Sequence, residues 1–79
     1  MIVNRQIYQG GRMEYGTRIK QIRERVGMTQ VELSAKSDIS QEHISRIENN
    51  HFTPTIKTAD KICDAMGATL NDLFVESEE

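Results

Sequence analysis

The chain has 79 residues, ten Lys and Arg against twelve Asp and Glu, and only two Tyr and two Phe as aromatic residues. This length allows one small domain, whose core must be built from Ile, Leu, Val, Met and Ala. No apolar run is long enough to span a bilayer and no signal-peptide pattern opens the chain, so we expect a cytoplasmic protein.

Residues 1–12 precede the part of the chain with helical periodicity. The pairs Ile2-Val3 and Ile7-Tyr8 have some strand character. Three alternatives stay open for this segment: a short strand that pairs with a neighbour, a basic arm carrying Arg5 and Arg12, or a loose terminus.

A first helix is predicted over about 14–26, with Gly27 as its C-terminal cap. Its apolar residues Ile19, Ile22 and Val26 recur at helical spacing and define the side that faces the core.

Two short capped helices follow. Thr29 stands three residues before Glu32, which is the spacing of a capping box, and it predicts a helix over about 30–36. Ser40 begins the next helix, over about 41–49, in the same way. The residues between them are enough only for a turn, in which we expect Asp38 to be left-handed and Ile39 to plug the core.

The second of these helices has two different sides. At about 100° per residue, Ile44 and Ile47 define a buried side. The opposite side carries amide, carboxylate, hydroxyl and guanidinium groups, which are the types that address base edges and phosphates; they belong to Gln41, Glu42, Ser45, Arg46 and Asn49. An ordinary solvated face is the alternative, but two capped helices around a tight turn are the layout of a helix-turn-helix, whose second helix enters the DNA major groove.

Glu48 does not belong to this polar side, because it lies about 70° from the buried centre of its helix. Arg23 has the same relation to the apolar side of the first helix. We therefore predict a largely buried ion pair between Arg23 and Glu48 that joins the first and third helices; two unrelated surface charges are the alternative.

The remainder of the chain completes the core. We expect a loop over 50–54 with Phe52 turned inward, and then a helix over about 55–66 closed by Gly67, with Thr69 capping a last helix from Leu70 to about Phe74. The stripe of the 55–66 helix is Ile56, Ala59, Ile62, Cys63 and Met66. As the single cysteine, Cys63 excludes an internal disulfide and is expected to be a buried thiol. The prediction is an all-α, compact bundle of four to five short helices over 13–75, with a central helix-turn-helix and an acidic tail at 76–79.

The same residues resemble the phage Cro/repressor-type helix-turn-helix family of DNA-binding transcriptional regulators, with a lambda-repressor-like domain. Three departures are small residues or tolerate a left-handed backbone: Ser34 stands for a usual Ala, and Asp38 and Asn50 stand for Gly. The matching segments are Arg23, Gly27 to Leu33, Ile39-Ser40, Ile44 to Asn50, Pro54, Ala65 to Gly67 and Leu70 to Phe74.

The resemblance and the chemistry of the side chains together suggest roles on DNA. Gln30 is expected to bind a phosphate at the start of its helix, and the resemblance implies that it also braces the first residue of the recognition helix. Gln41 is expected to pair with adenine, Arg46 with guanine or a phosphate, and Glu42 with cytosine, or to act as a filter against close phosphates.

Flanking residues complete the predicted DNA-binding set. Ser45 can serve bases or phosphates, whereas Asn49, Thr53 and Lys57 are expected at the DNA backbone. His43 lies beside the reading side and contacts either the sugar-phosphate backbone or nothing. The two cap residues, Thr29 and Ser40, are also included in the set.

Net charge is the one apparent objection to DNA binding. The formal charge is −2, but residues 70–79 hold four acidic and no basic residues, which leaves ten basic against eight acidic residues, a net +2, over 1–69. We expect few phosphate contacts per subunit and moderate non-specific affinity. The arm at 1–12 could add Arg5 and Arg12 to these contacts.

One recognition helix reads few base pairs, so a homodimer on a pseudo-palindromic operator is expected, with the helices about 34 Å apart. Apolar residues near the C-terminus are the predicted contact, and the alternative is that they close the chain's own core, as Leu70 and Leu73 are expected to do. The set is Met66, Leu70, Leu73, Phe74 and Val75.

Other function classes fit less well. His43, His51 and Cys63 lack metal-ligand spacing, and no paired carboxylates, nucleophile elbow or phosphate-binding loop occurs, so we expect neither an enzyme nor a cofactor. A protein-interaction module or antitoxin-like partner that reuses the fold is the main alternative. The polar side of the third helix argues against it, because a partner's groove would usually require apolar anchors there. With no sensor domain, no small-molecule effector is evident. A phage repressor, a restriction-modification controller and an antitoxin-like autoregulator all stay open, as does activation against repression.

Overall fold

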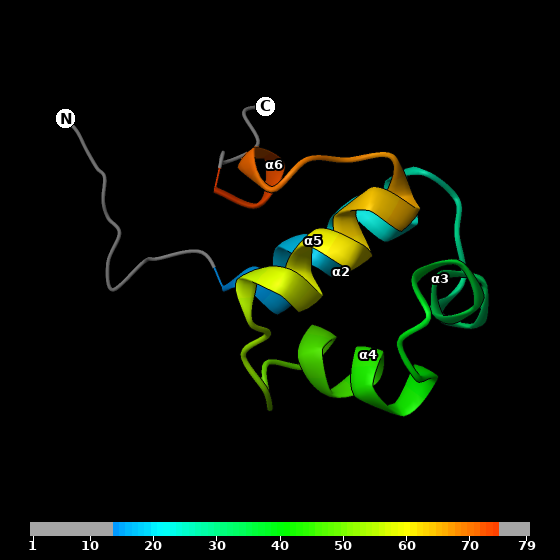
Figure 1. Ribbon diagram of the computed structural model, residues 1–79, viewed down its shortest axis with the longest axis horizontal. Coiled ribbons are helices and arrows are strands. Elements are labelled where there is room, and N and C mark those ends of the chain that lie inside the picture. Colours follow the sequence, from blue (N-terminus) through cyan, green and yellow to red (C-terminus); the bar gives the residue numbers. More distant parts are fainter. Residues whose placement is uncertain (1–13, 75–79) are drawn as a thin grey trace, which may run out of the picture.

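The computed structural model describes residues 14–74. It contains helices α2 (Tyr15–Arg25), α3 (Gln30–Ser37), α4 (Gln41–Glu48), α5 (Ile56–Met66) and α6 (Asn71–Phe74), joined by short loops (Figure 1). No strand occurs among these residues, so the all-α prediction is confirmed for this part of the chain. The predicted arm at 1–12, the acidic tail and Val75 lie outside the described residues.

Local hydrogen bonds explain where the central helices begin. The Thr29 hydroxyl accepts from the Glu32 N–H and the Glu32 carboxylate accepts from the Thr29 N–H, so the predicted capping box is present. The Ser40 hydroxyl accepts from the His43 N–H at the start of α4. Thr55 caps α5 in the same way, a cap that the sequence analysis had placed inside the helix. Each hydroxyl satisfies a backbone donor that a helix leaves free in its first turn.

The helices end at residues with positive φ angles. Gly27 and Gly67, at 75° and 74°, follow α2 and α5, where a side chain would be strained. The two non-glycine residues with positive φ among those described are Asp38 at 63° and Asn50 at 62°. The prediction of a left-handed Asp38 in the turn is therefore confirmed.

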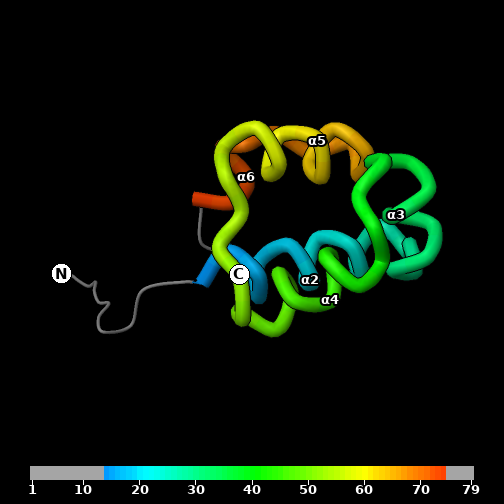
Figure 2. The backbone as a smooth tube through the Cα atoms, turned by 60° about the horizontal axis from the view of Figure 1, so that its bottom comes forward, coloured from blue at the N-terminus to red at the C-terminus, as the bar shows by residue number. Residues whose placement is uncertain are grey.

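The five helices surround one apolar core. α2 contacts α4, α5 and α6, while α3 contacts α4 and α5. Figure 2 shows α2 and α4 running side by side below α5, with α3 at one end. The largest fully buried side chains come from four different helices: Ile19, Leu33, Ile44, Ile47, Ile62 and Cys63.

A close approach brings α2 onto the C-terminal end of α4. Gly16 is buried, and a Cβ added to it would lie 1.8 Å from the Ile47 carbonyl oxygen and 2.6 Å from Asn50 Oδ1. The Asn50 side-chain amide donates to the Thr17 hydroxyl at 3.0 Å beside this contact. Gly16 therefore sets how closely α4 packs on α2.

A buried arginine ties the last helix to the first. Arg18 is only 5% exposed, and its Nε donates to the Asp72 carbonyl oxygen at 2.9 Å. The Asp72 carboxylate accepts from both the N–H and the hydroxyl of Thr69. These hydrogen bonds lower the pKa of Asp72, because they stabilise its charged form. The short α6 is thus fastened by polar contacts as well as by the buried Leu73.

Three apolar residues lie further out than predicted. Phe52 is 44% exposed rather than turned inward, because its loop passes outside the core. Ile56 is also exposed, since it lies in the first turn of α5, ahead of the turns that face the core. Val26, at 49% exposed, caps α2 beyond its last buried turn.

The last helix also departs from the prediction in one detail, because it begins at Asn71 rather than Leu70. No helix within residues 14–74 is long and apolar enough to cross a membrane.

Candidate nucleic-acid interface

The helix α4 presents one side to the core and the other to solvent. Ile44 and Ile47 are fully buried, as the helical periodicity of the sequence predicted. Gln41, Glu42 and Arg46 are exposed, and so is Asn49 at the C-terminal cap. The side chains that could address base edges therefore stand on an unobstructed surface of the described chain. We call this surface the α4 polar face; it consists of Gln41, Glu42, Ser45, Arg46 and Asn49.

The contacts within this face are weak. Arg46 Nη2 lies 3.8 Å from Glu42 Oε2, and these side chains are 63% and 82% exposed. The Asn49 amide donates to the Ser45 hydroxyl at 3.5 Å. An exposed ion pair of this kind contributes less than about 1 kcal/mol, so a phosphate or a guanine edge can replace it at little cost. A shallow hollow of about 200 Å³ lies beside the face, lined by Ser40, Glu42, His43 and Arg46.

Gln30 has a different partner from the predicted one. Its side-chain amide donates to Glu48 Oε1 at 3.0 Å, so it braces the end of α4 rather than Gln41 at its start. The reason is that Gln30 opens α3 directly beside the buried carboxylate, which has a lone pair to satisfy. The half-buried Gln30 amide is thus engaged in the free protein.

The predicted ion pair between Arg23 and Glu48 is present, as a bidentate contact. Arg23 Nε lies 2.6 Å from Glu48 Oε2, and Nη2 donates to Glu48 Oε1 at 3.0 Å. Nη1 donates to the Met28 carbonyl oxygen at 2.8 Å. The hydrogen bond to Glu48 raises the pKa of Arg23, against the opposing effect of burial. This pair holds the C-terminal end of α4 on α2, and so fixes the direction in which the α4 polar face points.

The flank of the interface is formed by the loop between α4 and α5. The His51 N–H donates to the Arg46 carbonyl oxygen at 2.9 Å, and the ring of Phe52 lies 4.7 Å from that of His43, measured between centroids. Thr53 and Lys57 are exposed beyond it, as their predicted role at the DNA backbone requires.

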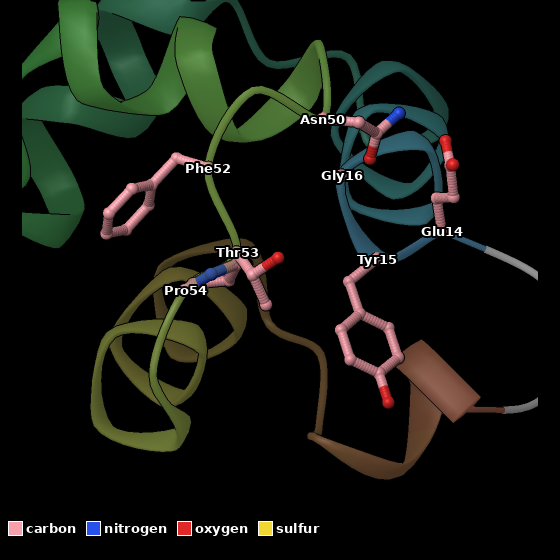
Figure 3. A pocket seen from close by; sticks show the side chains of 7 residues that line it. All are labelled: Glu14, Tyr15, Gly16, Asn50, Phe52, Thr53 and Pro54. Carbon is pink, nitrogen blue, oxygen red and sulfur yellow. The ribbon is translucent and has the colours of Figure 1, made fainter.

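Behind this loop lies a second hollow, of about 400 Å³, between the loop and the start of α2 (Figure 3). Its lining residues are Glu14, Tyr15, Gly16, Asn50, Phe52, Thr53 and Pro54. In Figure 3 the Phe52 ring points away from Tyr15, so the two aromatic rings do not close over the hollow.

The predicted dimer residues fall into different environments. Met66 and Leu73 are buried in the chain's own core, so their side chains offer no free surface to a second subunit. A small domain has few large apolar residues, and these two are needed to fill its core. Leu70 is half-buried and packs on the core. Phe74 is exposed, and its ring meets that of Tyr15 edge to face at 5.4 Å. Tyr15 was not among the predicted dimer-contact residues, and its position beside α6 is visible in Figure 3.

Cys63, the single cysteine of the chain, is fully buried as predicted. Burial raises the pKa of its thiol to about 11, with smaller contributions from Asp60 and Asp72. Among residues 14–74, no three His, Cys, Asp or Glu side chains are grouped so that they could hold a metal ion.

Comparison with known proteins identifies the unit built around α3 and α4. A family model described as Helix-turn-helix matches residues 19–73, from the middle of α2 into α6. The chain belongs to the Cro/repressor-type helix-turn-helix family. This family consists of DNA-binding transcriptional regulators, and the predicted resemblance is confirmed.

Relatives of this helix-turn-helix chain include regulators of several kinds. It is 36% identical over 63 residues to an uncharacterized HTH-type transcriptional regulator of Archaeoglobus fulgidus, covering 80% of this chain and 90% of that protein. It is 31% identical over 64 residues to the immunity repressor protein of Bacillus phage phi105, covering 81% of this chain but 44% of that protein.

Among solved structures, it is similar to the restriction-modification controller protein C.Esp1396I, with a TM-score of 0.72 and 34% identity. That match covers 77% of this chain and 80% of the controller.

Proposed function

We propose that this chain is a sequence-specific regulator that binds double-stranded DNA as a homodimer, on a pseudo-palindromic operator, with α4 in the major groove. The observation that carries the proposal is the division of α4 into two sides. Ile44 and Ile47 are fully buried, while Gln41 and Arg46 are free of strong contacts and exposed. A helix placed in this way can insert its polar side between the DNA backbones without disturbing the core.

Roles within the groove follow from the chemistry of the side chains. Gln41, at the first position of α4, is suited to the N6 and N7 edge of adenine, and Arg46 to the O6 and N7 edge of guanine. Glu42 lies within reach of Arg46, so it either accepts from cytosine or orients the guanidinium. Lys57, in the first turn of α5, and Thr53 are assigned to the DNA backbone, together with the free N–H groups of that helix end.

Dimer formation is supported by the apolar surface at the end of the described chain. Phe74 is 54% exposed although its ring packs against Tyr15, and Leu70, just before α6, is half-buried. A pair of such patches would bring two recognition helices to successive major grooves, about 34 Å apart. Two of the similar proteins are a phage immunity repressor and a restriction-modification controller, and we propose a role of that general kind for this chain.

The decisive experiment is selection of bound sites from a random pool of duplex DNA, followed by titration of the best site. We expect an enriched sequence with two-fold symmetry. Replacement of Arg46 by Ala should weaken binding by about 1–3 kcal/mol and relax preference at one base pair of each half-site, whereas Lys57→Ala should weaken all sequences alike and flatten the salt dependence.

Lys20→Ala is the matched control, because Lys20 is an exposed lysine of α2 with no assigned role on DNA. Its affinity should equal that of the parent protein. Failure to enrich any sequence, with no attraction to duplex DNA at low salt, would refute the proposal and favour a protein-interaction module.

Sedimentation tests the dimer separately. The parent protein is expected to form dimers at micromolar concentration or on its operator, and Phe74→Ala should shift the equilibrium towards monomers. A monomer both with and without DNA would remove the homodimer from the proposal while leaving DNA binding in place.

A further inference from the structure

The contact between Phe52 and His43 has no role in the core. Phe52 is 44% exposed and lies four residues beyond the end of α4, yet its ring reaches back to His43 in the first turn of that helix. The centroids lie 4.7 Å apart and the planes are inclined by 56°, which is within the range of a favourable aromatic contact. A half-exposed Phe gains little from burial, so this position needs another explanation.

The hollow behind the loop supplies that explanation. Phe52, Thr53 and Pro54 line one wall of a space of about 400 Å³, so the loop does not rest on the apolar core at this point (Figure 3). Two backbone hydrogen bonds hold its beginning, from Asn50 N–H to the Ile47 carbonyl and from His51 N–H to the Arg46 carbonyl. No backbone hydrogen bond to another part of the described chain holds the segment from Phe52 to Pro54.

We propose that Phe52 is a positioning residue for DNA binding, which acts through its ring contact with His43. The contact holds the loop beside the recognition helix, where Phe52, Thr53 and Pro54 line one side of the 400 Å³ hollow. It thereby restricts the positions open to the exposed Thr53, and it keeps the His43 ring beside the hollow that Glu42 and Arg46 also line. This inference rests on the proposed function and adds to it a residue that itself makes no base contact.

The physical consequence is an entropic one. Without the ring contact the loop samples more conformations, and DNA binding must then order it again. Affinity should fall by about 3- to 10-fold, which at about 1.4 kcal/mol per factor of ten is about 0.7–1.4 kcal/mol and matches the cost of ordering one side chain on binding. The loss should be similar for all sequences, because the contacts at stake are to the DNA backbone.

The experiment compares Phe52→Leu with Phe52→Tyr in the full chain, on the operator found by selection. Leu keeps apolar bulk but lacks a ring, whereas Tyr keeps the ring and adds only a hydroxyl. We expect the Leu variant to bind 3- to 10-fold more weakly, by about the loss estimated above, and the Tyr variant to bind like the parent. Equal binding by the Leu variant and the parent, or equal loss in both variants, would overturn the inference.

A second measurement reports on the contact without DNA. The ring current of Phe52 should shift the NMR resonances of the His43 imidazole, and this shift should vanish in Phe52→Leu and persist in Phe52→Tyr. Imidazole resonances that are unchanged by Phe52→Leu would overturn the inference by showing that the rings do not meet in solution.

Val26→Ala is the control for general effects on folding, because Val26 is 49% exposed and has no assigned role on DNA. The unfolding midpoints of Val26→Ala and Phe52→Leu should be similar, while only the second loses affinity. A parent protein that binds no duplex would instead refute the proposed function itself, so the two failures are distinguishable.

Discussion

Replacing one partner of the Arg23–Glu48 pair should destabilise the whole domain. The Glu48 side chain is 2% exposed and that of Arg23 is 11% exposed, so neither can recover its hydration in the folded state. Glu48 accepts from Arg23 Nε, Arg23 Nη2 and the Gln30 amide, which leaves its two oxygens well satisfied. Removing a single charge from such a buried pair typically costs about 3–5 kcal/mol.

The structure also predicts which of the two single variants, Arg23→Met or Glu48→Gln, loses more stability. In Arg23→Met the more deeply buried carboxylate remains, with only the Gln30 amide to stabilise its charge, and the Met28 carbonyl also loses its donor. In Glu48→Gln the Arg23 guanidinium remains, but it still donates to the Met28 carbonyl oxygen and has partial access to water. Arg23→Met is therefore expected to lose more stability. A chain of this size has about 4–12 kcal/mol in total, so either variant lies near the limit of folding.

The assay is a double-mutant cycle by urea unfolding, followed by circular dichroism. The loss in Arg23→Met combined with Glu48→Gln should be smaller than the sum of the single losses by about 0.5–3 kcal/mol. The exposed pair Arg46–Glu42 offers a control within the same chain, and its cycle should give a coupling below about 0.5 kcal/mol. Additive losses for the buried pair would refute the argument that the two charges stabilise each other.

Three further predictions concern the backbone and the core. Gly16→Ala should destabilise by about 3 kcal/mol in a thermal melt, because the clash with the Ile47 carbonyl outweighs the gain of about 1 kcal/mol in helix propensity; an unchanged melting temperature would contradict the close approach. Asp38→Gly should stabilise by about 0.5–1 kcal/mol in urea unfolding, because the left-handed cost of a side chain exceeds the backbone entropy cost of Gly, and a loss would show that Asp38 makes a compensating contact. Cys63 should react with a disulfide reagent at pH 8 only as fast as the chain unfolds, because its thiol is fully buried. The pKa of Cys63 is about 11 in the folded chain and lower in the unfolded chain, so the free energy of unfolding should fall as the pH rises from about 9 towards 11. A pH series of urea unfolding should show this fall in the parent protein and not in Cys63→Ala.

Much of the candidate interface could be predicted from the sequence because its causes are local. The caps at Thr29 and Ser40 act on backbone groups three residues away, and they form in any context that starts a helix there. The burial of Ile44 and Ile47 follows from helical periodicity once α4 exists. The ion pair of Arg23 with Glu48 also followed from periodicity, because two charges on the margins of two buried sides have few other partners.

Periodicity failed where helices end. Ile56 and Val26 fit the apolar stripes of α5 and α2, but a stripe indicates a direction and not the point at which the core stops. Phe52 was expected inside because large apolar residues are usually buried, and the loop that carries it passes outside instead.

The sequence by itself determined the helices, the caps at Thr29 and Ser40, the two sides of α4 and the family, because each depends on neighbours within a few residues or on a spacing along the chain. Only the tertiary structure decided the close packing at Gly16, the burial of Arg18 and the partner of Gln30. Each of these depends on a group that is distant in the chain, the Ile47 carbonyl, the Asp72 carbonyl and the Glu48 carboxylate. The positions of such groups are set by how whole helices pack, and packing is a property of the complete core.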